Sequence, residues 1–323
     1  MEKKQKILII KTGYSEFLDR ESDSRNVSLG DILRITPLLH LYKNDDVTWV
    51  SDKYAFPLLK ENPYINRLIH LDWITAEQLK SEEFDTVINL EKIPGICALS
   101  DNIRARRSRY GFTFDSQKGK AEAYDRATEV LSVSSDPIIK KENIRTFQDL
   151  LFEIVGAKWN GEGYVLGYKP KKIGEYEIGL NTKVGLKWPT KTWPFENWDK
   201  LEKILEQEGF KITRQDKQDS KVLKNIYDYM DWINSCNALI TSDSLGLHLG
   251  LALDKKVLVL FGPTPSKEIY FYGKGKAILP EIIPECLPCF KGICEMGRNC
   301  MQDITVERVY GEVKRCILYD NNV

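Results

Sequence analysis

The chain has 323 residues, enough for about two domains, each with its own apolar core. Its 47 basic and 47 acidic side chains give a formal net charge of zero, which argues against a protein that binds nucleic acid along its length. A mean hydropathy of −0.37 with 29 % charged residues excludes an integral membrane protein. The first apolar run, Ile7–Ile10, is too short for a secretory signal, so we expect a buried strand in a soluble, cytoplasmic protein.

Short β-branched runs alternate with helical patterns along the first half of the chain. The predicted strands are Ile7–Ile10, Val47–Val50 and Thr86–Leu90. Between the first two, apolar residues recur with helical spacing over Ile32–Tyr42, which predicts an amphipathic helix. This alternation is typical of α/β proteins with parallel sheets.

The same alternation returns in the second half of the chain. The predicted strands are Glu177–Leu180, Lys211–Thr213, Ala238–Thr241 and Lys256–Phe261. The predicted helices are Trp198–Glu208, Val222–Asn234, Leu245–Leu253 and the closing amphipathic segment Val306–Leu318. Two α/β domains are therefore predicted, over residues 1–165 and 175–323, with a polar junction between them. In such proteins ligands bind at the carboxyl ends of the strands.

The most informative motif is the strand that runs into Asp243 and Ser244 and continues as an apolar helix. Ser244 is a natural N-cap, so the first N–H groups of the helix would form an anion site at the end of the sheet. His248 follows one turn later on the same face, where it could contact a phosphate or a ribose hydroxyl. A capped core helix with one satisfied histidine would give the same pattern.

Two further turns carry residues suited to a diphosphate. Gly262 and Thr264 follow the next strand, where glycine allows close approach of a ligand and threonine can cap a helix. Upstream, Lys187 and Lys191 lie among three tryptophans in a loop that follows a strand. A lysine there can neutralise a phosphate as a point charge. The alternative is a packed aromatic loop with solvated lysines.

The first half offers a candidate general base. Gly30 and Asp31 precede the predicted helix, and a carboxylate in a first helical turn could accept a proton from a hydroxyl nucleophile. Such an aspartate is also a common partner of the helix dipole. Arg106, Arg107 and Arg109 form a basic patch that suits an anionic acceptor or an acidic membrane surface, unless it is a solvated face.

Four of the seven cysteines lie within residues 286–300, which we name the cysteine loop. They are Cys286, Cys289, Cys294 and Cys300. Four thiolates at this spacing could hold a structural zinc or iron, and the alternative is a loop of packed, reduced thiols. No histidine lies within the loop, so we expect no catalytic metal there.

In chain order, these motifs resemble glycosyltransferase family 9, the bacterial heptosyltransferases of lipopolysaccharide assembly. The matching segments are Lys11–Gly13, Ser28–Asp31, Thr36–Leu39, Asn62–Arg67, Trp188–Pro194, Ser242–His248, Leu260–Thr264 and Cys300–Met301. The Asp-Ser-x-Gly-x-His and Phe-Gly-Pro-Thr elements are specific when they occur together in this order.

The resemblance implies a GT-B fold, in which two Rossmann-like domains face a central cleft, the first for the acceptor and the second for a nucleotide sugar. It implies inverting, metal-independent transfer of heptose from ADP-heptose to a lipopolysaccharide core or another surface glycan, without a catalytic cofactor. By the same resemblance Asp31 is the general base and Lys191 contacts the donor phosphates. The donor-binding turn comprises Asp243, Ser244, Gly246 and His248.

The acceptor is less constrained than the fold. The stretch Tyr14–Val27 is longer than in the core heptosyltransferases and could act as a lid. The basic patch suits an anionic glycolipid, with peripheral contact at the cytoplasmic face of the inner membrane, or a protein acceptor. The alternatives are therefore a protein O-heptosyltransferase and a non-catalytic scaffold that binds a nucleotide sugar.

Overall fold

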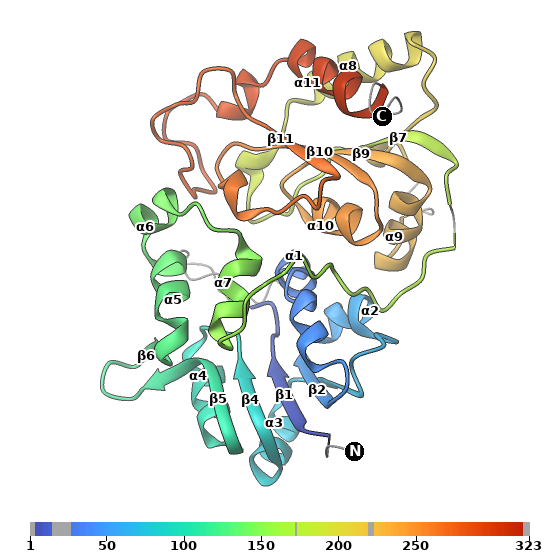
Figure 1. Ribbon diagram of the computed structural model, residues 1–323. Coiled ribbons are helices and arrows are strands. Elements are labelled where there is room, and N and C mark those ends of the chain that lie inside the picture. Colours follow the sequence, from blue (N-terminus) through green and yellow to red (C-terminus); the bar gives the residue numbers. More distant parts are fainter. Residues whose placement is uncertain (1–3, 15–26, 172, 219–222, 319–323) are drawn as a thin grey trace. The chain divides into compact units, whose positions relative to one another are not determined.

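The computed structural model describes residues 4–14, 27–171, 173–218 and 223–318, so most of the expected lid lies outside the described residues. The chain forms two compact units, Met1–Tyr168 and Lys169–Val323. Each unit is built around its own sheet, and each is described by itself (Figure 1).

The first unit contains a six-stranded sheet with the order β3-β2-β1-β4-β5-β6. The strands are β1 Lys6–Ile10, β2 Asp46–Ser51, β3 Arg67–His70, β4 Glu83–Asn89, β5 Arg104–Asp115 and β6 Lys120–Ala123. The first five run parallel, and β6 pairs antiparallel with the end of β5. The strands predicted from β-branched runs are all present, and β1 in the centre is buried from Ile7 to Ile10.

Helices surround this sheet, as expected for parallel strands. They are α1 Leu29–Leu33, α2 Phe56–Leu59, α3 Trp73–Ser81, α4 Pro94–Asn102, α5 Thr128–Ser135, α6 Pro137–Glu142 and α7 Phe147–Ile154. Short 3₁₀ segments cover Thr36–Tyr42, Lys53–Ala55 and Asp125–Ala127.

The single helix predicted over residues 32–42 is wrong. The chain instead forms the short helix α1, which ends at Leu33, and then a 3₁₀ helix over Thr36–Tyr42. Pro37 stands near the start of the second segment, where its missing N–H and fixed φ are tolerated only in a first turn. The break leaves Asp31 in the first turn of a separate five-residue helix.

The second unit contains a parallel five-stranded sheet with the order β11-β10-β9-β7-β8. The strands are β7 Tyr176–Asn181, β8 Ile212–Arg214, β9 Cys236–Ser242, β10 Lys256–Leu260 and β11 Gly275–Ile278. The helices are α8 Phe195–Gln207, α9 Ile226–Asn234, α10 Leu245–Ala252 and α11 Val306–Val313, which continues as a π-helical turn over Lys314–Leu318. Short 3₁₀ segments cover Pro189–Lys191, Gln215–Lys217, Ser266–Glu268 and Cys300–Asp303.

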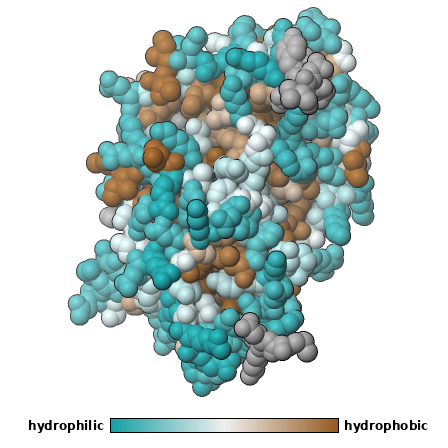
Figure 2. Space-filling model, in the orientation of Figure 1, coloured by the Kyte–Doolittle hydropathy of each residue, from teal (hydrophilic) through white to brown (hydrophobic). Residues whose placement is uncertain are grey.

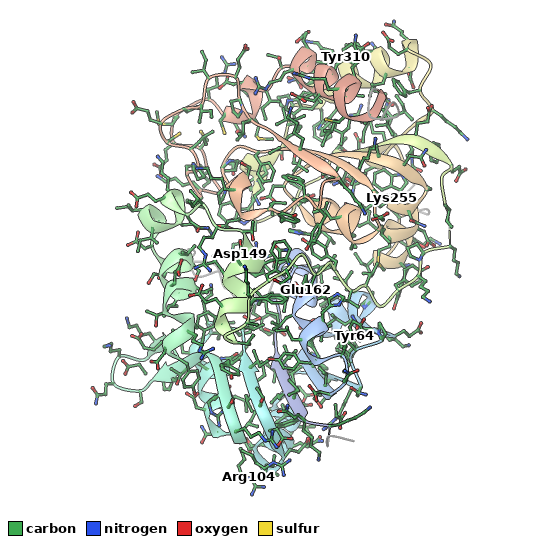
Figure 3. All side chains as sticks on the ribbon, in the orientation of Figure 1. Tyr64, Arg104, Asp149, Glu162, Lys255 and Tyr310 are labelled. Atoms are coloured by element: carbon green, nitrogen blue, oxygen red, sulfur yellow. The ribbon has the colours of Figure 1, made fainter. Side chains whose placement is uncertain are left out.

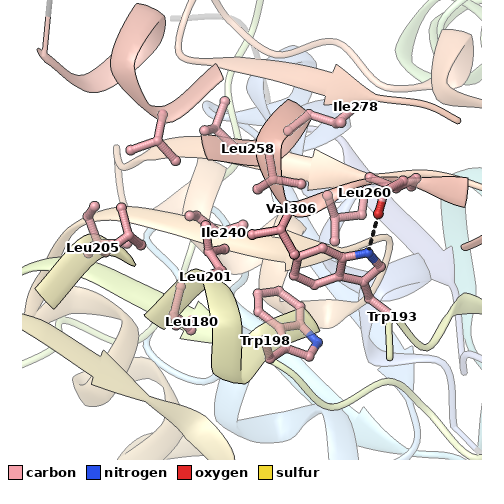
Figure 4. Packing of buried hydrophobic residues seen from close by; sticks show 14 of the residues in the cluster. Leu180, Trp193, Trp198, Leu201, Leu205, Ile240, Leu258, Leu260, Ile278 and Val306 are labelled. Carbon is pink, nitrogen blue, oxygen red and sulfur yellow. Dashed lines mark hydrogen bonds between the residues drawn. The ribbon is translucent and has the colours of Figure 1, made fainter. Parts of the chain in front are cut away.

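The core beneath one face of this sheet ties the loop after β7 to the segment before α11 (Figure 4). Trp193 and Trp198 are fully buried with their rings edge to face, 4.8 Å between centroids. The indole N–H of Trp193 donates to the carbonyl oxygen of Ile304 at 2.9 Å. Two of the three tryptophans in this loop are therefore core residues, which anchors the chain on both sides of the cysteine loop.

Hydrophilic residues cover most of the face shown in Figure 2, and apolar residues are exposed there in small groups. Within the described residues no helix combines the length and the apolarity that a membrane span requires.

Candidate active site

Asp243 is the centre of the candidate site in the second unit. It follows β9 directly, and one of its oxygens, Oδ2, accepts hydrogen bonds from the Lys191 ammonium at 2.8 Å and from the Thr264 hydroxyl at 2.6 Å. Lys191 ends the 3₁₀ turn after β7, and Thr264 follows β10. The ends of three neighbouring strands therefore converge on one carboxylate, as the parallel topology requires.

The charges around Asp243 keep it ionised. Burial raises the pKa of Asp243, but the Lys191 ammonium, the Thr264 hydroxyl and the nearby His248 together lower it below its ordinary value of 3.8. The Lys191 and Asp243 side chains are only 13 % and 15 % exposed, so solvent screens their attraction weakly. The Lys191 ammonium also lies 5.4 Å from the centroid of the Trp188 ring.

The first turn of α10 is fixed by polar side chains of the sheet. Ser244 caps the helix by accepting from the N–H of Gly246 at 3.3 Å, as predicted from the sequence. The Asn181 amide, at the end of β7, donates to the Ser244 hydroxyl at 3.3 Å and accepts from the Tyr229 hydroxyl at 2.7 Å. Sequence analysis missed Asn181 and Tyr229, because their contact with Ser244 is visible only once the strands are paired.

Two of the glycines predicted to bind the donor pack against protein atoms. A Cβ on Gly246 would stand 2.3 Å from the Asn181 amide nitrogen and 2.7 Å from the Tyr229 hydroxyl. A Cβ on Gly262 would stand 2.8 Å from the sulfur atoms of both Cys300 and Met301. These contacts alone require glycine at both positions, so close approach of a ligand is not needed to explain the two glycines.

The predicted lysines and histidine occupy different settings. Lys191 contacts Asp243, whereas Lys187 lies earlier in the same loop. A Cβ added at Gly292 would stand 3.0 Å from the carbonyl oxygen of Lys187. His248 lies in α10 and is only 6 % exposed. The charge of His248 acts on Asp243, so His248 lies near Asp243.

In the first unit the turn after β1 is held by a buried glutamate that sequence analysis missed. Glu91, which follows β4 and is fully buried, accepts from the N–H groups of Thr12 and Gly13, both at 2.7 Å. The Lys11 ammonium lies 3.3 Å from the same oxygen. Gly13 has a φ of +83° and accepts from the N–H of Ser28 at 2.8 Å, which attaches the start of α1 to this turn.

Asp31 therefore lies at the carboxyl ends of the strands in the first unit. Its Oδ1 is 3.1 Å from the guanidinium Nε of Arg34, one helical turn later. Arg34 in turn stacks on the ring of Phe147 at the start of α7, 3.7 Å from the ring centroid. The guanidinium is held between an aromatic ring and the carboxylate, so it orients Asp31.

Lys92 is a further cation whose charge interacts with that of Asp31. Burial lowers the pKa of Lys92 to about 7, and the charges of Lys11, Lys140 and Arg34 add to this effect, whereas Asp31 opposes it. The Lys92 ammonium lies 5.6 Å from the centroid of the Phe112 ring. This gathering of positive groups is typical of a site for an anionic ligand, and the sequence alone did not indicate it.

The lowered pKa of Lys92 predicts a pH-dependent effect on folding. Above pH 7 the unfolded chain retains the Lys92 proton that the folded protein has released, so this group makes stability rise between about pH 7 and 10. Lys92→Met should therefore stabilise the protein at pH 6.5 by more than about 1 kcal/mol, and the advantage should shrink towards pH 9.5. Urea denaturation of both proteins across this range tests it, with Lys43→Met on an exposed lysine as the control. A stability difference that does not vary with pH would contradict the account.

The predicted arginine patch lies at the opposite end of the sheet from Asp31. Arg106 and Arg107 pair with Asp85 near the start of β4, and Arg109 donates to the carbonyl oxygens of Ser100 and Ile103. Figure 3 shows Arg104, which begins this strand, and Asp149 of α7 at opposite ends of the first unit. The arginines are thus engaged away from Gly30 and Asp31.

The cysteines are close together but do not form a set of metal ligands. Burial raises the pKa of the Cys300 thiol to about 11, and the charges of the other three thiols in the loop raise it further. The Cys294 thiol points to the carbonyl oxygen of Arg298 at 3.3 Å, and the Cys300 thiol to Asn299 Oδ1 at 3.7 Å. Among the described residues no three His, Cys, Asp or Glu side chains are arranged to hold a metal ion. The predicted zinc or iron site is therefore not assembled in this structure.

The family model for glycosyltransferase family 9 (heptosyltransferase) matches residues 222–299, which include the Asp243 turn, Thr264 and most of the cysteine loop. The chain is therefore similar to glycosyltransferase family 9 over about a quarter of its length. The lipooligosaccharide heptosyltransferase 2 of Campylobacter jejuni is 30 % identical to this chain over 81 residues. That alignment spans 25 % of the chain and only 26 % of the relative, so the chain matches about a quarter of the relative's length.

The likeness in fold to solved structures extends over nearly the whole chain. The Escherichia coli heptosyltransferase WaaC, solved with ADP-2-deoxy-2-fluoro heptose, is 15 % identical with a TM-score of 0.61, covering 96 % of this chain and 99 % of WaaC. The iron-containing dodecameric glycosyltransferase TibC of enterotoxigenic E. coli is 13 % identical with a TM-score of 0.56, covering 97 % of this chain and 76 % of TibC. Together with the two parallel sheets, these matches establish the GT-B fold.

Proposed function

We propose that the protein is a glycosyltransferase that transfers heptose from ADP-heptose to the core of a lipopolysaccharide or a related surface glycan. The observation that carries the proposal is the convergence of Lys191, Thr264 and the capped start of α10 on Asp243. The match to the heptosyltransferase family model and the ADP-sugar analogue named for WaaC support the choice of donor. The C. jejuni relative supports a lipooligosaccharide acceptor.

On the donor side, we propose that Lys191 and the first N–H groups of α10 bind the diphosphate. A lysine and a helix N-terminus both stabilise the negative charge that grows on the phosphate oxygens as the bond to the sugar breaks. The Asp243 carboxylate orients the Lys191 ammonium and the Thr264 hydroxyl, and Ser244 and His248 line the same turn. Charge stabilisation by these groups requires no metal ion.

On the acceptor side, we propose that Asp31 is the general base of an inverting, single-displacement reaction. The acceptor hydroxyl would attack the anomeric carbon, its proton would pass to the Asp31 carboxylate, and the bond from that carbon to the diphosphate would break to release ADP. The Arg34 guanidinium, 3.1 Å from Asp31 Oδ1, orients the carboxylate. Lys92 and Lys140 favour an acceptor that carries carboxylate or phosphate groups.

The donor assignment predicts selective stabilisation by one nucleotide. A ligand present at 100 times its Kd stabilises the folded state by about 2.7 kcal/mol, which raises Tm by several degrees. We expect ADP and ADP-heptose to raise Tm in this way, with or without EDTA, and UDP, GDP and CMP to raise it less. Stabilisation by UDP or GDP instead would retain the glycosyltransferase and refute ADP-heptose as the donor. A strict need for a divalent cation would refute metal independence.

A further inference from the structure

The cysteine loop contacts both turns that place a side chain on Asp243. One turn carries Lys191 and the other carries Thr264. The cysteine loop contributes neither the ammonium nor the hydroxyl, so the proposed chemistry gives the loop no role. Its hydrogen bonds to the two turns suggest a structural role for it.

The first contact is with the turn of Lys191. The Thr190 hydroxyl donates to the carbonyl oxygen of Lys291 at 2.7 Å, and the Asn299 side-chain amide donates to the carbonyl oxygen of Thr190 at 3.0 Å. Thr190 is only 7 % exposed, so these bonds are largely shielded from water. The residue immediately before Lys191 is thus bonded at both its side chain and its carbonyl group to the cysteine loop.

The second contact is with the turn of Thr264. The N–H of Phe290 donates to the carbonyl oxygen of Pro263 at 2.9 Å, one residue before Thr264. On the same turn, Gly262 packs so closely on Cys300 and Met301 that no side chain fits between them. The cysteine loop therefore fixes the backbone beside each of the two donors to Asp243.

We propose that Asn299 and Thr190 are positioning residues, through which the cysteine loop sets the places of the Lys191 ammonium and the Thr264 hydroxyl for the donor diphosphate. The inference rests on the proposed donor site. Displacement of a binding group by about 1 Å can cost as much as 100-fold in activity, so a loosened turn should weaken diphosphate binding measurably. As the turns loosen, the hydrogen bonds from the Lys191 ammonium and the Thr264 hydroxyl to the Asp243 carboxylate would also weaken.

Two substitutions separate positioning from folding. In Asn299→Asp the carboxylate still accepts from the N–H of Met301, as Asn299 Oδ1 does at 3.0 Å, but it cannot donate to Thr190. Thr190→Val removes the hydroxyl at nearly constant volume and constant charge, and Thr190→Ser restores the hydroxyl. Asn225→Asp is the matched control, because Asn225 also caps a helix through its Oδ1 and donates through its Nδ2, to Asp228 on α9.

The experiment measures ADP affinity by calorimetry for the wild type and the four variants, together with Tm without ligand and the KM for the acceptor. We expect ADP binding to weaken about tenfold or more in Asn299→Asp and Thr190→Val. In Thr190→Ser and Asn225→Asp it should stay near the wild-type value. The KM for the acceptor should stay unchanged in all four variants. If Asn299→Asp does not fold, the valine and serine variants decide the question.

Lys191→Ala keeps this test distinct from that of the donor site. Suppose that Lys191→Ala loses ADP affinity while the folded Thr190→Val and Asn299→Asp variants bind ADP as the wild type does. The positioning role is then refuted and the donor site stands. If Lys191→Ala binds ADP normally, both are refuted. Equal weakening in the valine and serine variants would also overturn the inference, because the hydroxyl would then be irrelevant.

Discussion

An Asp31→Asn variant should transfer sugar about 10²–10⁴-fold more slowly than the wild type, while its affinity for ADP stays the same. Asparagine has nearly the same shape as aspartate and keeps an oxygen facing Arg34, but it cannot take a proton from the acceptor hydroxyl. The loss should therefore appear in kcat. Initial rates of ADP release in the presence of acceptor measure it, and calorimetry with ADP measures the affinity.

Asp45→Asn is the matched control for this variant. Asp45 is another aspartate of the first unit, and its Oδ1 accepts from the N–H of Gln5, which an asparagine oxygen can also do. Transfer by this control should match that of the wild type. Unchanged transfer in Asp31→Asn would refute the role of Asp31 as the base, whatever the fold.

Lys191→Ala should weaken ADP binding by about 10–100-fold. A hydrogen bond from an ammonium to a charged group contributes about 1.5–3 kcal/mol, and each 1.4 kcal/mol is a factor of ten in Kd. The substitution also leaves the Asp243 carboxylate without the cation that lies 2.8 Å away, so its charge would repel the phosphates more strongly. Calorimetric titration with ADP measures the change.

Lys203→Ala, on an exposed lysine of α8, controls for the loss of one positive charge and should bind ADP normally. Lys187→Ala tests the second lysine that was predicted to contact the donor. Added magnesium should not restore binding to Lys191→Ala, because the proposed site neutralises the diphosphate without a metal. Recovery with magnesium, or normal affinity without it, would contradict the account.

Local signals in the sequence predicted the parts of the site that depend on neighbouring residues. The β-branched runs before Lys11 and Asp243 predicted buried parallel strands, and Ser244 predicted the cap of α10. Because parallel strands end at the same edge of a sheet, the two turns predicted to bind a diphosphate meet, and Thr264 lies against Asp243. Their hydrogen bond of 2.6 Å confirms this.

Contacts between distant residues could not be predicted in this way. Glu91 binds the turn at Thr12 across 79 positions of the sequence, and Asn181 meets Ser244 only because β7 and β9 are neighbours in the sheet. The cations around Asp31 likewise come from separate elements. A charge run read along the sequence favoured Arg106 instead, whose strand register places it beside Asp85 at the far end of the sheet.

The cysteine loop shows a different limit. Thiol spacing alone is compatible with a metal site, but the directions of the side chains depend on what the loop packs against. Here Asn299 and Lys291 bind the turn at Thr190, and the Cys294 and Cys300 thiols turn to oxygen acceptors within the loop.

The most direct test of the proposed function is the release of ADP from ADP-heptose in the presence of EDTA, measured with and without a lipooligosaccharide core that lacks its heptose. The account predicts release only when this acceptor is present, with heptose found on the acceptor by mass spectrometry and the anomeric configuration inverted. No transfer to that core, transfer only to a polypeptide, or retention of configuration would contradict it.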